Sequence, residues 1–225
     1  MGLKMPSWAE FNGANQAEYF ARGQRSFVYR LKYKGKEAAA KVERADRDAI
    51  CRASNEAKWL KLLNKKKIGP KLLLEGSDFI LVEFVEGKRI LEFAETAEKE
   101  ELSKALLDVM MQCRALDKIN VSKEEMHNPW KHIIVGKKPA ISPGSKPPFS
   151  SVKKAVMIDF ERCHYDIHPK NVTQFCQFLM SKKQYALLET KGIKFEKEKA
   201  IALLKQYKTG RDVFEELLKS VSLKP

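Results

Sequence analysis

Three charged residues, far apart in the chain, have the types and the order that nucleotide chemistry needs. Lys41 ends a short apolar stretch, residues 37–42, and Glu56 follows fifteen residues later in a strongly helical segment. Asp159 comes directly after the apolar residues 155–158. A nucleoside triphosphate requires a cation on its phosphates, a carboxylate that holds this cation, and a second carboxylate on Mg²⁺. The sequence therefore predicts a site for ATP and Mg²⁺ built from these three residues.

Glu56 lies at the edge of the apolar face of a helix predicted over residues 47–66. Positions 53, 56 and 60 share one helical face. A carboxylate beside a buried face needs a partner, because burying an unpaired charge is costly. Taken alone, Glu56 is better explained as an exposed residue of a lysine-rich helix. Together with Lys41 and Asp159, it predicts an ion pair with Lys41.

Composition places the chain among ordinary folded proteins. Its 225 residues are 44% hydrophobic and 32% charged, which suits one good core or two small lobes. The sequence has no membrane-span-length apolar stretch and no signal-peptide core, so we expect no membrane partner. The four cysteines show no paired spacing, which indicates free thiols in a reducing compartment. We therefore expect a cytoplasmic protein, or a nuclear one in a eukaryote.

The net charge of +14 predicts either an acidic partner or high solubility. Basic residues are in excess between positions 30 and 71 and are densest at Lys65, Lys66 and Lys67. One interpretation is contact with RNA, a ribonucleoprotein or an acidic protein. The other is a solvated helix face, because no aromatic platform or nucleic-acid motif accompanies the lysines.

Hydrophobic periodicity predicts an α+β protein in two lobes. Residues 1–21 form an N-terminal extension with a short helix over 8–20. Residues 22–87 form an antiparallel sheet with one main helix, and residues 88–225 are mainly helical, with a Pro- and Ser-rich insertion at about 136–154. The expected strands cover residues 23–33, 36–43, 71–74, 79–82, 133–135 and 156–159. Beyond the main helix, the expected helices cover residues 90–96, 98–116, 171–188, 197–208 and 211–221.

The order of these features resembles the protein kinase fold, and in particular the small atypical RIO-like kinases. The resemblance spans roughly residues 20 to 180. The residues that carry it are Gly23, Ser26, Val28, Tyr29, Lys41, Glu56, a hinge at 83–87, Lys131 to Val135, Asp159 with Phe160, and the stretch 169–175. It implies a bilobal protein-kinase-like fold, ATP and Mg²⁺ as cofactors, and phosphoryl transfer to serine or threonine of a protein substrate.

The resemblance also implies roles for single residues. Gly23, Ser26 and Val28 belong to a reduced phosphate loop. Lys41 contacts the α- and β-phosphates, Glu56 orients Lys41, and Asp159 binds Mg²⁺. In the hinge, the backbone of Glu83 and Val85 reads the adenine edge.

The chain departs from the kinase pattern in its glycines. Arg25 and Val28 stand at the second and third glycine positions of the phosphate loop. Glu161 replaces the glycine of Asp-Phe-Gly, which limits backbone flipping and fits an enzyme without activation-loop switching. No Ala-Pro-Glu motif follows, so part of the usual substrate-binding region is missing.

The catalytic loop is the largest departure, because the family pattern H-x-D-L-x-x-x-N fits in three registers. Anchoring on His127 puts Pro129 at the base. Placing His132 at the metal-binding asparagine puts His127 at the base. A register with two extra residues puts Glu125 there, and a carboxylate can accept a hydroxyl proton.

Two neighbours of these residues also have candidate roles. Lys131 is a candidate for the γ-phosphate. His132 is a candidate metal ligand, although imidazole suits hard Mg²⁺ poorly, and a hydrogen bond to Asp159 or substrate is the alternative. For Glu125, the alternative is an ordinary exposed residue.

Two functions follow. The first is an ATP-dependent RIO-like kinase with slow turnover, acting on a protein, on itself or as an ATPase. The second is a nucleotide-binding pseudokinase that serves as a scaffold for a ribonucleoprotein or an acidic protein.

Overall fold

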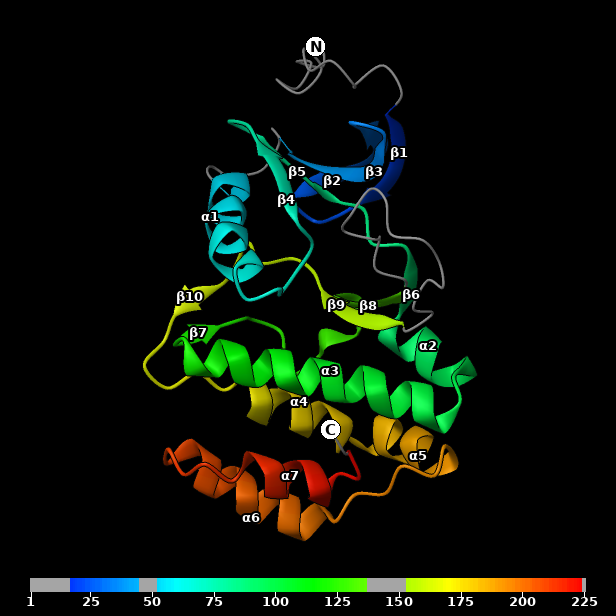
Figure 1. The fold of residues 1–225 in the computed structure, drawn as a ribbon, viewed down its shortest axis with the longest axis vertical. Helices are drawn as coiled ribbons and strands as arrows, with labels where there is room; N and C mark the ends of the chain where they lie inside the picture. The colour runs from blue at the N-terminus through cyan, green and yellow to red at the C-terminus, as the bar shows by residue number, and fades with distance from the viewer. Residues whose placement is uncertain (1–16, 45–51, 137–152, 224–225) are drawn as a thin grey trace, which may run out of the picture. The chain divides into compact units, whose positions relative to one another are not determined.

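The computed structural model describes residues 17–44, 52–136 and 153–223, and it divides the chain into two compact units (Figure 1). Unit 1 comprises Met1–Phe84 and Ile158–Cys163. Unit 2 comprises Val85–Met157 and His164–Pro225. The short return of residues 158–163 to unit 1 matters most for the site, because it carries Asp159 into the same unit as Lys41 and Glu56.

Unit 1 is built on an antiparallel five-stranded sheet with the order β1-β2-β3-β5-β4 (Figure 1). Its strands are β1 (Glu18–Arg22), β2 (Ser26–Tyr33), β3 (Lys36–Glu43), β4 (Leu72–Glu75) and β5 (Phe79–Glu83). The two-residue turn between β2 and β3 places both Lys34 and Gly35 at positive φ, the conformation that suits a tight hairpin.

The core of unit 1 follows from alternation along β3. Ala38, Ala40 and Val42 are buried, while the residues between them are half-buried. These small side chains pack with Leu31, Phe79 and Leu81 in one apolar cluster. Helix α1 (Arg52–Asn64) contacts β3, β4 and β5 and buries an apolar stripe of Ala53, Ala57, Trp59, Leu60 and Leu63.

Phe160 anchors the returning segment in unit 1. Its side chain is fully buried. A Cβ atom on Gly69 would lie 2.8 Å from Phe160 Cε2 and 3.0 Å from Leu60 Cδ2, and Gly69 has φ +76°. Glycine is therefore required at position 69 both for its backbone conformation and for the close approach of the phenylalanine ring.

Unit 2 is mainly helical, with two small sheets (Figure 1). Strands β6 (Gly87–Arg89), β8 (Ile133–Gly136) and β9 (Lys154–Met157) form one sheet in the order β6-β8-β9, and β7 (Val121–Ser122) pairs with β10 (His164–Tyr165). The helices are α2 (Ile90–Thr96), α3 (Lys99–Lys118), α4 (Asn171–Leu179), α5 (Lys182–Thr190), α6 (Lys197–Lys208) and α7 (Phe214–Ser220), with a 3₁₀ turn, η3, at Pro129–Lys131.

The longest helix, α3, organises this unit. It contacts α4, β7 and β9, and its buried residues recur at helical spacing: Leu102, Ala105, Leu106, Val109, Met110, Cys113 and Leu116. None of the helices within the described ranges is long and apolar enough to cross a bilayer. The predicted α+β fold class, with an N-terminal antiparallel sheet, one main helix and a mainly helical remainder, is confirmed.

Three element predictions need correction. Residues 18–20, expected in a helix, belong to β1. The helix expected over 171–188 is two helices, because Met180 ends α4 and Ser181 adopts an extended conformation before α5. The strand expected over 156–159 ends at Met157, so Asp159 lies beyond it. Most of the expected insertion, residues 137–152, lies outside the described residues.

Candidate functional site

Lys41 lies in the middle strand of the unit 1 sheet, where β3 pairs with both neighbours. It is opposite Val28 on β2 and Ile80 on β5. Its side chain is 20% exposed. The Lys41 Nζ donates to Glu56 Oε2 at 2.7 Å and to Asp159 Oδ1 at 2.8 Å. The structure therefore brings together the three residues that the sequence singled out.

Glu56 is the most buried member of this group. Its side chain is 5% exposed, and it projects from α1 within the helix's buried face. One carboxylate oxygen accepts from Lys41, and the other accepts from the backbone N–H of Phe160 at 3.1 Å. Glu56 thus joins β3, α1 and the returning segment at a single carboxylate.

Asp159 occupies an unusual backbone conformation. Its φ is 65°, in the left-handed region that residues with a side chain seldom adopt. Phe160 follows with its side chain fully buried, so the strained turn directs Asp159 to Lys41 while the ring enters the core. Such strain is common where a side chain must be aimed.

The charges in this cluster determine its protonation. Burial alone would lower the pKa of the Lys41 ammonium, but the carboxylates of Glu56, Asp159 and Glu161 outweigh it, and the pKa is raised above its ordinary value. Burial raises the pKa of the Glu56 carboxyl, while the ammonium of Lys41 and the N–H of Phe160 oppose that rise. Lys41 is therefore a permanent cation at neutral pH.

The carboxylates supply the ligand atoms that a hard divalent cation prefers. Oxygen atoms of Glu56, Asp159 and Glu161 all lie within 4.8 Å of one another. Mg²⁺ is bound in proteins by one or two carboxylates together with substrate phosphates and water. Asp159 fits this role well, because its side chain is 34% exposed, whereas that of Glu56 is occupied and buried.

The predicted phosphate-loop residues lie at the turn between β1 and β2. The Gly23 N–H donates to the Ser26 carbonyl at 2.8 Å, and Ser26 begins β2 opposite Glu43. Val28, opposite Lys41, is half-buried. A small cavity of about 10 Å³ lies between this turn and Lys41, and its lining includes Arg25 and Ser26.

The predicted hinge residues fall on either side of the unit boundary. Glu83 ends β5 in unit 1, where its backbone N–H donates to the Lys71 carbonyl at 2.9 Å. Val85 is the first residue of unit 2. The role of these two residues in reading adenine stays a prediction.

In unit 2, the structure pairs Glu125 with His132. His132 Nε2 and Glu125 Oε2 are 2.6 Å apart. Glu125 has φ 68°, and its carbonyl accepts the N–H of Asn128, so the residue begins a tight turn. The pair contains two of the residues that compete for roles in the catalytic loop. A metal role for His132 stays a prediction.

The other two candidates of this segment are exposed. The Lys131 ammonium lies 4.8 Å from the centre of the Trp130 ring, a cation–π contact. His127 is solvent-exposed, while Met126 beside it is fully buried. The buried Met126 side chain therefore anchors the loop, while the side chains of His127 and Lys131 remain accessible to solvent.

Sequence analysis missed the network that fixes the start of this loop. The Asp117 carboxylate, at the end of α3, accepts the backbone N–H groups of Asn171 and Val172 at the start of α4 and the hydroxyl of Tyr207. The Asn171 side chain donates to the Val121 carbonyl and accepts the Lys123 N–H. A carboxylate at a helix N-terminus is favourable, but nothing in the spacing of 117 and 171 indicates their contact.

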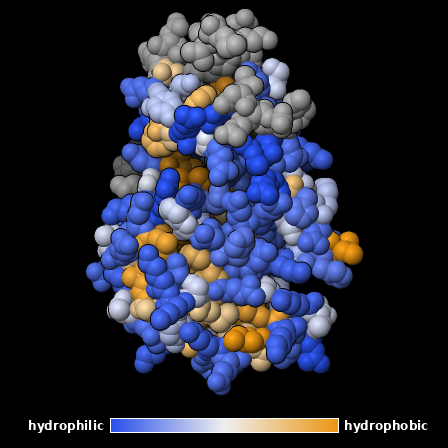
Figure 2. All heavy atoms as spheres, turned by 180° about the vertical axis from the view of Figure 1, so that it is seen from behind, coloured by the Kyte–Doolittle hydropathy of each residue, from blue (hydrophilic) through white to orange (hydrophobic). Residues whose placement is uncertain are grey.

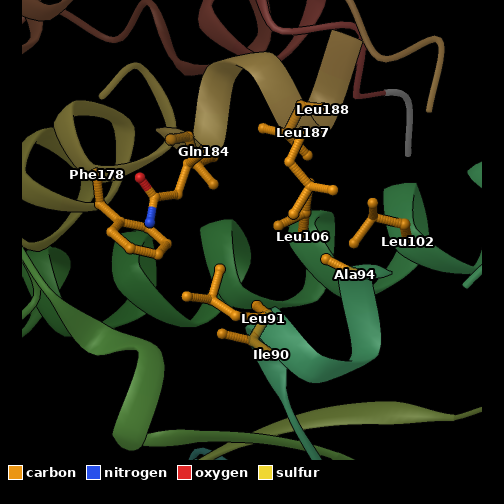
Figure 3. A pocket seen from close by; sticks show the side chains of 10 residues that line it. Ile90, Leu91, Ala94, Leu102, Leu106, Phe178, Gln184, Leu187 and Leu188 are labelled. Atoms are coloured by element: carbon orange, nitrogen blue, oxygen red, sulfur yellow. The ribbon is translucent and has the colours of Figure 1, made fainter. Parts of the chain in front are cut away.

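Another small cavity, of about 10 Å³, lies among the helices of unit 2 (Figure 3). Ile90, Leu106, Phe178 and Leu188 project into it from four helices, with Gln184 at its side. Its lining carries no ionisable side chain, so it offers nothing for phosphoryl chemistry. On the surface, hydrophilic side chains cover most of the face shown in Figure 2, in agreement with the 32% of charged residues.

Among solved structures, the chain is similar to the autoinhibited serine kinase domain of the giant muscle protein titin, with a TM-score of 0.49 and 17% sequence identity. The similarity covers 68% of this chain and 47% of that chain, so this chain spans about half the length of the kinase structure. No protein-family model matches, and the comparison with curated proteins finds no relative. Function must therefore be argued from the side chains of this chain, and the RIO-like group stays a prediction.

Proposed function

We propose that the chain is an ATP-dependent, kinase-like phosphotransferase of the RIO-like type. It transfers phosphate slowly to serine or threonine of a protein, to itself or to water. The observation that carries the proposal is the Lys41 ammonium, 2.7 Å from Glu56 and 2.8 Å from Asp159. Phosphoryl transfer depends mainly on positioning and charge neutralisation, and this arrangement can supply both.

Each member of the cluster has a role in this proposal. Lys41 binds the α- and β-phosphates, and Glu56 keeps it oriented. Asp159 is the proposed ligand of Mg²⁺, which would neutralise phosphate charge when bound. Gly23, Ser26 and Val28 would cover the phosphates, and the backbone of Glu83 and Val85 would bind adenine.

Glu125 is the proposed group that accepts the proton of the attacking hydroxyl. Its pairing with His132 supports this choice over His127, because the imidazole orients the carboxylate. Lys131, at the end of η3, is the candidate for contact with the γ-phosphate. A carboxylate base in an altered loop is consistent with slow turnover.

The test is γ-phosphate transfer with Mg-ATP, comparing wild type with Lys41→Ala, Asp159→Ala and Glu125→Gln. We expect phosphoprotein or ADP from wild type, and none above background from Lys41→Ala or Asp159→Ala. Glu125→Gln should lose about a hundredfold in rate and still bind ATP. Wild-type turnover no greater than that of Asp159→Ala would refute the phosphotransferase.

The second candidate function is a nucleotide-binding scaffold. It is favoured by the altered catalytic loop, where Glu125 and His132 replace the usual aspartate and asparagine chemistry. Here ATP would stabilise the fold, and the basic surface around Lys65, Lys66 and Lys67 would contact a ribonucleoprotein or an acidic protein. ATP-dependent thermal stabilisation without turnover would support this function, and loss of a genuine turnover in Glu125→Gln would exclude it.

A further inference from the structure

Glu161 stands where the kinase pattern has glycine, and its carboxylate is surrounded by three cations of unit 1. Its Oε2 lies 3.1 Å from Lys41 Nζ. Its Oε1 lies 3.4 Å from an Arg52 guanidinium nitrogen and 3.7 Å from one of Arg25. The side chain is only 12% exposed. These cations come from β3, from the start of α1 and from the predicted phosphate loop.

The backbone of Glu161 is fixed independently of these ion pairs. The Asn55 side-chain amide donates to the Glu161 carbonyl at 2.6 Å. Phe160, the preceding residue, is fully buried. The carboxylate can therefore leave the three cations by rotation about side-chain bonds, without movement of the chain.

The space around the carboxylate is already filled. The cavity beside it measures about 10 Å³ and is lined by Arg25, Ser26, Lys41, Glu43, Ala53, Glu56 and Glu161. That volume is about enough for one water molecule. A phosphate group can occupy the position between the three cations only if the Glu161 side chain moves out.

Carboxylates already compensate the cations of Arg25, Lys41 and Arg52 without a ligand, since Glu56, Asp159 and Glu161 each contact at least one of them and Glu43 lines the same cavity. Adding a phosphate chain therefore favours the departure of one carboxylate.

Glu161 has the longest individual ion-pair contacts of the three carboxylates, and these contacts are spread over three cations. Its contacts with cations measure 3.1–3.7 Å, against 2.7 Å for Glu56 and 2.8 Å for Asp159. Glu56 has a further hydrogen bond from a backbone N–H. Because Glu161 contacts all three cations, it is the carboxylate with which an incoming anion competes directly.

We propose that Glu161 is a positioning residue that occupies the phosphate position between Arg25, Lys41 and Arg52, and that the phosphate chain of a nucleotide displaces it. This inference rests on the proposed nucleotide site, and it identifies a residue that sets the affinity of that site for nucleotides. Glu161 keeps the three cations converged before binding and competes with the phosphates for them. It therefore weakens binding in proportion to the number of phosphates that reach the cations.

The experiment measures dissociation constants of ATP, ADP and adenosine by isothermal titration calorimetry, with and without Mg²⁺. Glu161→Gln should bind ATP on the order of tenfold more tightly than wild type, since it removes up to three partly exposed ion pairs. The gain should be smaller for ADP, and adenosine affinity should not change. If Glu161 had only a structural role, its substitution would change the dissociation constants of all three ligands by similar factors.

Two variants complete the design. Glu75→Gln is the matched control, because Glu75 pairs with Lys61 at an exposed position of unit 1 and should leave all three affinities unchanged. Glu161→Asp keeps the charge on a shorter side chain, and its gain in ATP affinity should be smaller. Glu161→Asp also provides the test if Glu161→Gln does not fold.

Each remaining outcome is decisive. Equal or weaker ATP binding by Glu161→Gln would overturn the competition, while the proposed nucleotide site stands if wild type binds ATP and Lys41→Ala does not. Weakening seen only with Mg²⁺ would make Glu161 a metal ligand and likewise overturn the competition. No ATP binding by wild type or any variant would overturn the proposed function itself.

Discussion

The two groups of candidate residues differ most in the burial of the carboxylate that pairs with the basic side chain, since Glu56 is 5% exposed and Glu125 is 43% exposed. In unit 1, Lys41 and Glu56 are largely buried; Lys41 contacts three carboxylates, one of them Glu56, which also accepts a backbone N–H. In unit 2, Glu125 and His132 contact each other at 2.6 Å, and the Glu125 side chain is 43% exposed. The first group therefore contributes to the stability of its own unit, whereas the second can change with little effect on folding. In the proposed function, the first group binds phosphates and would benefit from rigidity, and the second accepts a proton and would benefit from access to water.

Removing the central cation should produce the largest effect. Lys41→Ala leaves three carboxylates facing one another, which should lower the free energy of unfolding by about 3 kcal/mol at neutral pH. The loss should shrink as the pH falls, because protonation of the carboxyl groups relieves their repulsion. Urea unfolding at pH 7 and pH 5 measures both quantities.

Lys61→Ala is the control for that experiment. Lys61 pairs with Glu75 at 2.7 Å, but its side chain is 59% exposed, so its removal should cost less than about 1 kcal/mol. Similar losses for Lys41→Ala and Lys61→Ala would contradict the view that the unit 1 cluster stabilises the fold.

The next largest effect concerns the close packing of Gly69 against Phe160, the residue that follows Asp159. Gly69→Ala must place a methyl group 2.8 Å from the Phe160 ring at φ +76°, and we expect a loss of about 1–3 kcal/mol. Gly35→Ala is matched in backbone, with φ +75° and nothing within 4 Å of the added Cβ, so it should lose less. Thermal unfolding of both variants separates crowding from backbone strain. Equal losses would mean that Phe160 yields easily.

Glu125→Gln should change the free energy of unfolding by less than about 1 kcal/mol, because the carboxylate is partly exposed and its pair is weak in water. Denaturant unfolding next to the activity assay makes the comparison sharp. A variant that loses both stability and turnover would show that Glu125 is a structural residue, and the contrast between the two groups would fail.

The smallest effect is a pH dependence in unit 2. The backbone N–H of His168 and the hydroxyl of Ser122 hold the pKa of Asp166 below its ordinary value. Such a carboxylate stabilises the fold above its unfolded-state pKa of about 3.9 and ceases to do so as the pH falls through the lower, folded-state value. Asp166→Asn should therefore lose stability at pH 7 and little at pH 2. Equal losses at both pH values would be inconsistent with this assignment.

The sequence predicted Lys41, Glu56 and Asp159 because each follows or lies within a strong local pattern. Strand alternation fixed the position of Lys41, and helical spacing placed Glu56 at a buried face. The pairing of Glu56 with Lys41 then followed from the cost of an isolated buried charge.

Other contacts have no local pattern that would reveal them. Glu161 was noted only as a missing glycine, because its three cations lie far away in the chain. The break between α4 and α5 falls at Met180 and Ser181, without glycine or proline to mark it. Tyr19 and Phe20 were expected at the end of a helix, and pairing of their segment with β2 makes it a strand instead.

The hydrogen-bond network at Asp117 has a consequence for the way unit 2 unfolds. The Asp117 carboxylate accepts hydrogen bonds from the backbone of α4 and from the Tyr207 hydroxyl on α6. The Asn171 side chain in turn accepts the N–H of Lys123, in the segment after β7. Elements that share one hydrogen-bonded carboxylate tend to unfold cooperatively. Local opening of the segment after β7 should therefore be rare. The amide proton of Lys123 should then exchange with deuterium about as slowly as the slowest protons of α3.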